Sequence, residues 1–120
     1  MKPEFQPGKN IAMKVPAHEF EKTVHFYEVI LGFNRLEMGS EGDRESIAFC
    51  FGDKNLWIDK VSEMSQAEIW LEVTTNNVEQ AQAYLENQGC LFRNEIERLP
   101  QSLNGFWLNS PANNIHLVVD

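Results

Sequence analysis

The sequence repeats one pattern, in which a strand and a helix are followed by three shorter strands. Alternating apolar and polar residues from Asn10 to Val15 predict the first strand, and an apolar stripe at helical spacing from Glu19 to Leu31 predicts the first helix. A shift of about 58 positions places Val15 on Val73 and Phe20 on Val78, so the second half repeats the first. About 60 residues enclose too small a core to be stable alone. The sequence therefore predicts two like modules that pack sheet against helix.

The remaining elements are short apolar runs bounded by turn residues. Asn77 and Gln80 resemble a capping arrangement for the second helix, and Gly32 and Gly89 stand where helix C-terminal caps are expected. The predicted strands are 33–38, 46–51, 55–59, 68–73, 90–94, 105–109 and 114–119. The residues before Lys9 contain two prolines and a glycine and predict a loose arm. We expect one α+β domain, with βαβββ modules at about 9–60 and 67–120, curved mixed sheets and helices outside.

The charge balance excludes several classes of partner. Ten Lys and Arg against eighteen Asp and Glu give a formal net charge of −8. This charge opposes binding to nucleic acid and to anionic lipid, and it favours cationic ligands. No apolar run approaches the roughly 20 residues of a membrane helix, and the first residues lack the apolar stretch of a signal peptide. We therefore expect a cytoplasmic protein that binds neither nucleic acid nor membrane.

The sheet face turned away from the helices carries the candidate functional residues. If Ile11, Val15, Ile58, Ile115 and Leu117 face the helices, a period of two places their neighbours on the opposite face. That face would hold Asn10, Ala12, Lys14, Trp57, Asp59, Glu68, Trp70, Glu72, His116 and Val118, joined by Trp107. We expect Lys14 to keep the neighbouring carboxylates ionised. The face is either a hydrated or dimer-buried surface, or an aromatic-lined cup for a small molecule.

Two segments of the chain resemble the vicinal oxygen chelate superfamily, which includes glyoxalase I, extradiol dioxygenases, and fosfomycin- and bleomycin-resistance proteins. The first segment runs from Asn10 to Phe33, with its Phe26-Tyr27 and Leu31-Gly32-Phe33 motifs. The second, Phe106 to Leu117, is similar to the family's Asp-Pro-x-Gly-Asn turn and final strand, with Ser110 replacing Asp and Asn113 replacing Gly. The resemblance covers nearly the whole chain after Lys9 and implies the glyoxalase/bleomycin-resistance fold.

The resemblance to metal-dependent members of the superfamily implies one candidate site. Carried over residue by residue, the ligand positions hold Asn10, Asp59, Glu68 and His116. Two carboxylates and an imidazole suit Ni, Zn or Mn, whereas the neutral amide of Asn10 departs from the usual His or Gln. Glu68 or Glu72 would then move the proton in a lyase or isomerase reaction like that of glyoxalase I.

The resemblance to bleomycin-resistance proteins implies a different function. It is carried by the segments 56–58, 69–73 and 114–118, and it implies a metal-free homodimer that sequesters an aromatic or cationic compound. Trp57, Trp70 and Trp107 would stack on flat rings, Glu68 and Glu72 would pair with amines, and His116 would line the site. We favour this binding function, for which no cofactor is predicted, over the metal-dependent enzyme. A third alternative is an aromatic face that is simply buried between subunits.

Overall fold

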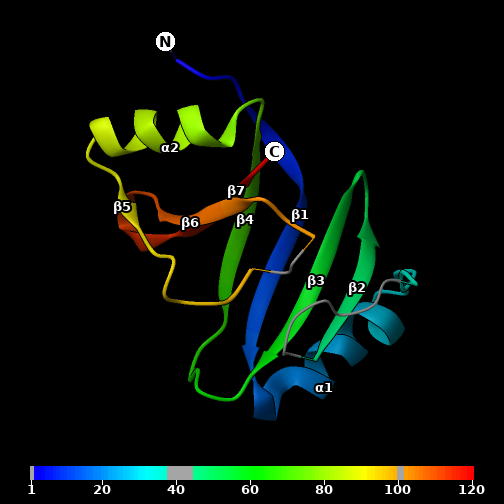
Figure 1. The fold of residues 1–120 in the computed structure, drawn as a ribbon. Helices are drawn as coiled ribbons and strands as arrows, with labels where there is room; N and C mark the ends of the chain where they lie inside the picture. The colour runs from blue at the N-terminus through cyan, green and yellow to red at the C-terminus, as the bar shows by residue number, and fades with distance from the viewer. Residues whose placement is uncertain (1, 38–44, 100–101) are drawn as a thin grey trace. The chain divides into compact units, whose positions relative to one another are not determined.

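The structure is a computed structural model that describes residues 2–37, 45–99 and 102–120 (Figure 1). The chain divides into two compact units, residues 9–69 and residues 1–8 together with 70–120. The elements are β1 Phe5–Pro16, α1 Ala17–His25, a π-helical turn Phe26–Ile30, β2 Ser46–Phe51, β3 Lys54–Val61, β4 Glu68–Thr75, α2 Val78–Asn87, β5 Leu91–Phe92, β6 Gly105–Asn109, a 3-10 turn Pro111–Asn113 and β7 Ile115–Val119. The predicted α+β class, with mixed sheets and two helices, is confirmed.

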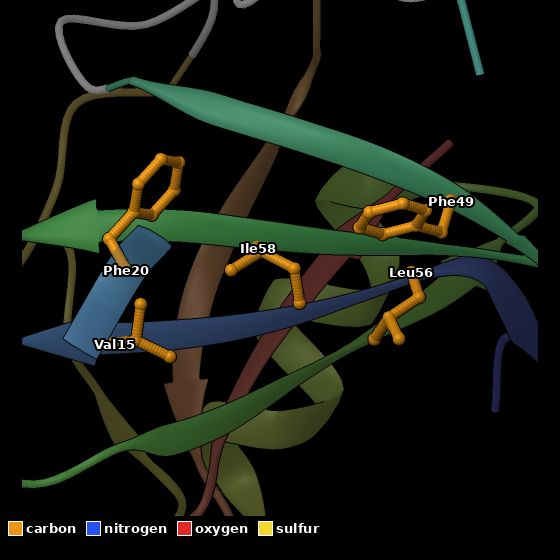
Figure 2. Packing of buried hydrophobic residues seen from close by; sticks show 5 residues of the cluster. All are labelled: Val15, Phe20, Phe49, Leu56 and Ile58. Carbon is orange, nitrogen blue, oxygen red and sulfur yellow. The ribbon is translucent and has the colours of Figure 1, made fainter. Parts of the chain in front are cut away.

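The unit of residues 9–69 packs α1 against a mixed sheet. Within it β1 pairs parallel with β3, and β2 pairs antiparallel with β3. The core contains Val15 of β1, Phe49 of β2, Leu56 and Ile58 of β3, and Phe20 of α1 (Figure 2). The sequence placed the residues of β1 and β3 on this helix-facing side correctly, because Ile, Leu, Met or Val occupies every second position of 11–15 and of 56–58.

The second unit packs α2 against the mixed strands β4, β5, β6 and β7. Here β4 pairs parallel with β7, β7 pairs antiparallel with β6, and β6 pairs antiparallel with β5. The core is formed by Ala81 of α2 with Phe106, Leu108 and Val118. The predicted helix start is confirmed, since Asn77 Oδ1 accepts a hydrogen bond from the Gln80 backbone N–H at 2.9 Å.

The prediction of a loose arm before Lys9 is wrong. Phe5 already belongs to β1 and packs against the core of the second unit, with its ring centroid 6.1 Å from that of Tyr84. The Thr75 hydroxyl donates to the Glu4 carbonyl at 2.9 Å, and the Glu4 N–H donates to Asn76 Oδ1 at 3.1 Å. Contacts with residues some 70 positions away therefore override the local preference of Pro and Gly for irregular structure.

Two predicted strands are shorter than expected. Of the run 33–38, only Arg35 forms a β-bridge, to Phe49, and Met38 lies outside the described residues. The run 90–94 is a strand only at Leu91–Phe92, because the Asn94 side chain turns back to accept the backbone N–H of Trp107. No described helix has the length and apolar character that a membrane span requires.

Gly105, the first residue of β6, allows the close approach of β6 and β7. A Cβ atom at this position would overlap the backbone carbonyl oxygen of Val118, which cannot move without breaking the ladder. We expect Gly105→Ala to lower the free energy of unfolding by about 3 kcal/mol, measured by urea denaturation. Gly52→Ala is the matched control, because a Cβ there meets open space and costs only the strain of a positive φ, about 1 kcal/mol. Equal losses in the two variants would contradict this explanation.

Candidate functional site

The sheet face of residues 9–69 that is turned away from α1 consists of three cross-strand rows. We call it the Trp57 face. The rows are Asn10–Asn55–Cys50, Ala12–Trp57–Ala48 and Lys14–Asp59–Ser46. These residues alternate along their strands with the apolar residues that pack on α1, so the pleat fixes which side chains share this face.

One row contains a buried ion pair. Lys14 Nζ lies 2.7 Å from Asp59 Oδ2, and the two side chains are 3% and 11% exposed. The Ser46 hydroxyl donates to the other carboxylate oxygen, Asp59 Oδ1, at 2.6 Å. Lys14 is thus the partner of a neighbouring carboxylate, as predicted. Both oxygens of Asp59 are already engaged within the protein.

Another row fixes the orientation of an indole ring. Asn10 Oδ1 accepts hydrogen bonds from Trp57 Nε1 at 2.9 Å and from Asn55 Nδ2 at 3.0 Å. An amide oxygen has two lone pairs, and these two donors use both of them. The half-buried Trp57 has alanines as its direct cross-strand neighbours, so short side chains flank the oriented ring. The arrangement is a preformed aromatic surface.

The second unit contains two further candidate tryptophans, Trp70 and Trp107. Their ring centroids are 5.1 Å apart at an interplanar angle of 70°, an edge-to-face pair, and they are only 7% and 5% exposed. Across the ladder, Trp107 lies beside Leu117, and Leu117 lies beside Glu72. Trp107 therefore shares its face with Leu117 and Glu72, as expected from the burial of Phe106 and Leu108 against α2.

The predicted orientation of β7 is wrong. Val118 lies in the α2 core and pairs with Phe106 and Val73, so its side of the strand is the helix side. His116 pairs with Leu108 and Leu71 on that same side, away from Trp107, and its Nδ1 lies 3.3 Å from the Asn114 carbonyl oxygen. Four of the five residues of β7 are apolar, so the sequence pattern does not indicate which of them face α2.

A short segment that follows β5 contacts Trp107 directly. We call Arg93–Glu97 the strap. Trp107 donates its backbone N–H to Asn94 Oδ1 and its indole N–H to the Glu97 carbonyl, each at 2.9 Å. Within the strap, the Arg93 side chain hydrogen-bonds to Glu95 at 2.6 Å and lowers the pKa of this exposed carboxyl below its usual value. The strap therefore lies against the edge of a nearly buried indole.

The predicted metal ligands do not fit a divalent ion as they lie here. Asn10 and Asp59 use their oxygens in hydrogen bonds within the protein, and His116 faces the α2 side of its sheet. Glu68 is an exposed residue at the start of β4. Within residues 2–37, 45–99 and 102–120, no three His, Cys, Asp or Glu side chains lie close enough to hold a metal ion.

Comparison with known proteins identifies the fold. No protein-family model and no curated protein matches the sequence. A hypothetical protein of Bacillus halodurans C-125 superposes with a TM-score of 0.72 at 10% identity over 97% of this chain and 94% of its own. Methylmalonyl-CoA epimerase from Mycobacterium tuberculosis gives 0.66 at 11% identity, over 94% of this chain and 86% of its own.

Larger proteins contain the same fold. Homoprotocatechuate 2,3-dioxygenase from Arthrobacter globiformis gives a TM-score of 0.65 at 16% identity over 98% of this chain, which spans 36% of the dioxygenase chain. The epimerase and the extradiol dioxygenases are members of the vicinal oxygen chelate superfamily. The fold of the chain is therefore the one that the sequence resemblance implied. A specific closeness to bleomycin-resistance proteins stays a prediction.

The buried ion pair makes a testable contribution to stability. Lys14→Met leaves a buried carboxylate without its cation, and we expect it to lower the free energy of unfolding by about 3–5 kcal/mol in urea denaturation. The double variant Lys14→Met/Asp59→Leu should recover most of this loss, since no buried charge remains. Lys60→Met is the control, because the exposed Lys60–Glu45 pair contributes less than about 1 kcal/mol. Equal effects of the two single variants would contradict a buried pair.

Proposed function

We propose that this chain binds and sequesters a small aromatic or cationic molecule, without a metal and without transforming it. The observation that supports this most strongly is the fixed indole of Trp57, hydrogen-bonded to Asn10 and flanked by alanines. A stacking surface that is oriented before binding loses little freedom when a planar ligand arrives. Cation–π attraction to an indole contributes about 0.5–2 kcal/mol, and the net charge of −8 concentrates cations near the protein.

The remaining predicted ligand-binding residues keep their roles in this proposal. Trp70 and Trp107 form a separate aromatic group within the other unit, and Glu68 and Glu72 supply negative charge that can pair with amines. His116 fits less well, because its side of β7 faces α2.

The alternative is a metal-dependent lyase or isomerase resembling glyoxalase I. It would require Asp59, Glu68 and His116 to hold Ni, Zn or Mn while Glu68 or Glu72 moves a proton. The hydrogen bonds that engage Asn10 and Asp59 favour the metal-free function instead. Stoichiometric metal in the purified protein, lost on Asp59→Asn, would support the enzyme.

We further propose that the protein acts as a homodimer; a cytoplasmic location also stays a prediction. Several large apolar side chains of the unit 9–69 are exposed at the end of the first helix and on β2. They are Phe26, Val29, Ile30, Leu31 and Phe51. Two copies that each carry a charge of −8 repel one another, so an apolar surface is the part of the chain best suited to self-association.

The dimer proposal predicts a change of mass. Ile30→Glu places a charge in the exposed apolar group, and we expect it to shift the protein from dimer to monomer in size-exclusion chromatography with light scattering. Glu21→Lys, on the exposed surface of α1, is a charge-changing control that should leave the mass unchanged. A monomeric parent protein, or a dimeric Ile30→Glu variant, would refute this interface.

The binding proposal predicts saturable quenching of tryptophan fluorescence by a planar aromatic cation such as an acridinium dye. We expect Trp57→Leu to weaken the affinity about tenfold, because the stacking and cation–π contribution is removed. Asn10→Ala should weaken it about threefold, because it frees the indole ring without removing it. Asn104→Ala, which removes an exposed hydrogen bond in the other unit, is the control. Unsaturable quenching, or an unchanged affinity in Trp57→Leu, would refute the proposed site.

A further inference from the structure

The strap is attached mainly through the polar groups of one residue, Trp107. The backbone N–H of Trp107 donates to Asn94 Oδ1, its indole N–H donates to the Glu97 carbonyl, and its own carbonyl accepts the Arg93 N–H, each at 2.9 Å. Every polar group of Trp107 is thus bonded to the strap. When the strap moves away, all three bonds are exchanged for bonds to water together.

Two further hydrogen bonds attach or close the strap. Arg93 Nη1 donates to Asn109 Oδ1 at 3.3 Å, and the turn inside the strap is closed by the Ile96 N–H on the Arg93 carbonyl at 3.2 Å. None of the five strap residues is buried, and none belongs to the α2 core. Each such hydrogen bond contributes little net free energy, because a bond to water replaces it when the strap leaves. The strap is therefore held more weakly than the strand on which it lies.

The indole against which the strap lies belongs to an aromatic pair. Trp70 and Trp107 are 7% and 5% exposed and contact each other edge to face. Phe106 and Leu108, the neighbours of Trp107, point into the α2 core, so the β6 ladder stays anchored when the strap leaves. Movement of the strap then uncovers an indole edge without disturbing the core of the unit.

We propose that Arg93–Glu97 is a lid over the indole edge of Trp107, which opens while the sheet stays folded and admits an aromatic or cationic ligand to this ring. The nature of the ligand rests on the proposed function, whereas the opening of the lid does not. In the closed state the lid shields the Trp107 indole edge from water and from other proteins. In the open state it offers the Trp107 indole edge to the compounds that the Trp57 face is proposed to bind.

Hydrogen exchange of the ligand-free protein, followed by NMR, tests the opening. We expect the Trp107 indole N–H and the Arg93 amide to exchange together, at least about 100-fold faster than the β7 amides and independently of low urea concentrations. Asn94→Ala should accelerate both about fivefold, the effect of one lost hydrogen bond, and leave the urea midpoint unchanged. Asn104→Ala, which removes a side-chain bond to Asp120 next to β6, should have no effect. Exchange at the rate of the β7 amides would overturn the lid, since the strap would then open only by global unfolding.

Titration of the same protein with the acridinium dye tests the admission of a ligand. We expect the dye to shift the Trp107 indole resonance, and to bind about fivefold faster to Asn94→Ala than to the parent chain. A dye that shifts the Trp57 resonance but leaves Trp107 unchanged would overturn admission under the strap while supporting the proposed function. A dye that binds nowhere would refute both the proposed function and admission of the ligand, and the exchange rates would still decide whether the strap opens.

Discussion

The hydrogen bond from the Trp57 indole to Asn10 Oδ1 determines how the Trp57 face can be used. Together with the bond from Asn55 it fills both lone pairs of an oxygen that the family resemblance offered as a metal ligand. In the neighbouring row, Lys14 and Ser46 each bind one carboxylate oxygen of Asp59. The oxygens of Asn10 and Asp59 that could have bound a metal are therefore occupied by hydrogen bonds within the protein. The oriented Trp57 ring is the group on this face that is suited to contact a partner.

The same fold supports different chemistry in its structural neighbours. They include an epimerase and a 2,3-dioxygenase, both of them less than 20% identical to this chain. The backbone pattern therefore does not select a reaction, and the function has to be argued from the side chains on the strands. In this chain those side chains are tryptophans, amides and a buried ion pair, and on the Trp57 face their polar atoms are hydrogen-bonded to one another.

The sequence predicted those parts of the structure where alternation is strong. Ile, Leu, Met or Val occupies every second position of 11–15 in β1 and of 56–58 in β3, so the residues that pack on α1 and the contact between Lys14 and Asp59 were both predictable. β7 is almost uniformly apolar, and only its pairing with β4 and β6 shows that His116 faces α2. The first residues were mistaken for an arm because Pro7 and Gly8 favour irregular structure locally. In the structure Glu4 is held by Thr75 at the end of β4, and Phe5 packs against α2. The strap could not be predicted either, because no local sequence pattern indicates that the Glu97 carbonyl accepts a hydrogen bond from the Trp107 indole.

The most direct test of this account is the NMR resonance of the Trp57 indole N–H during titration with Zn²⁺. Because Asn10 and Asp59 already use their oxygens within the protein, we predict that one equivalent of zinc leaves this resonance and the fold unchanged. A stoichiometric shift of the Trp57 resonance that disappears in Asp59→Asn would show that the Trp57 face is a metal centre. That result would contradict the account of the chain as a metal-free binding protein.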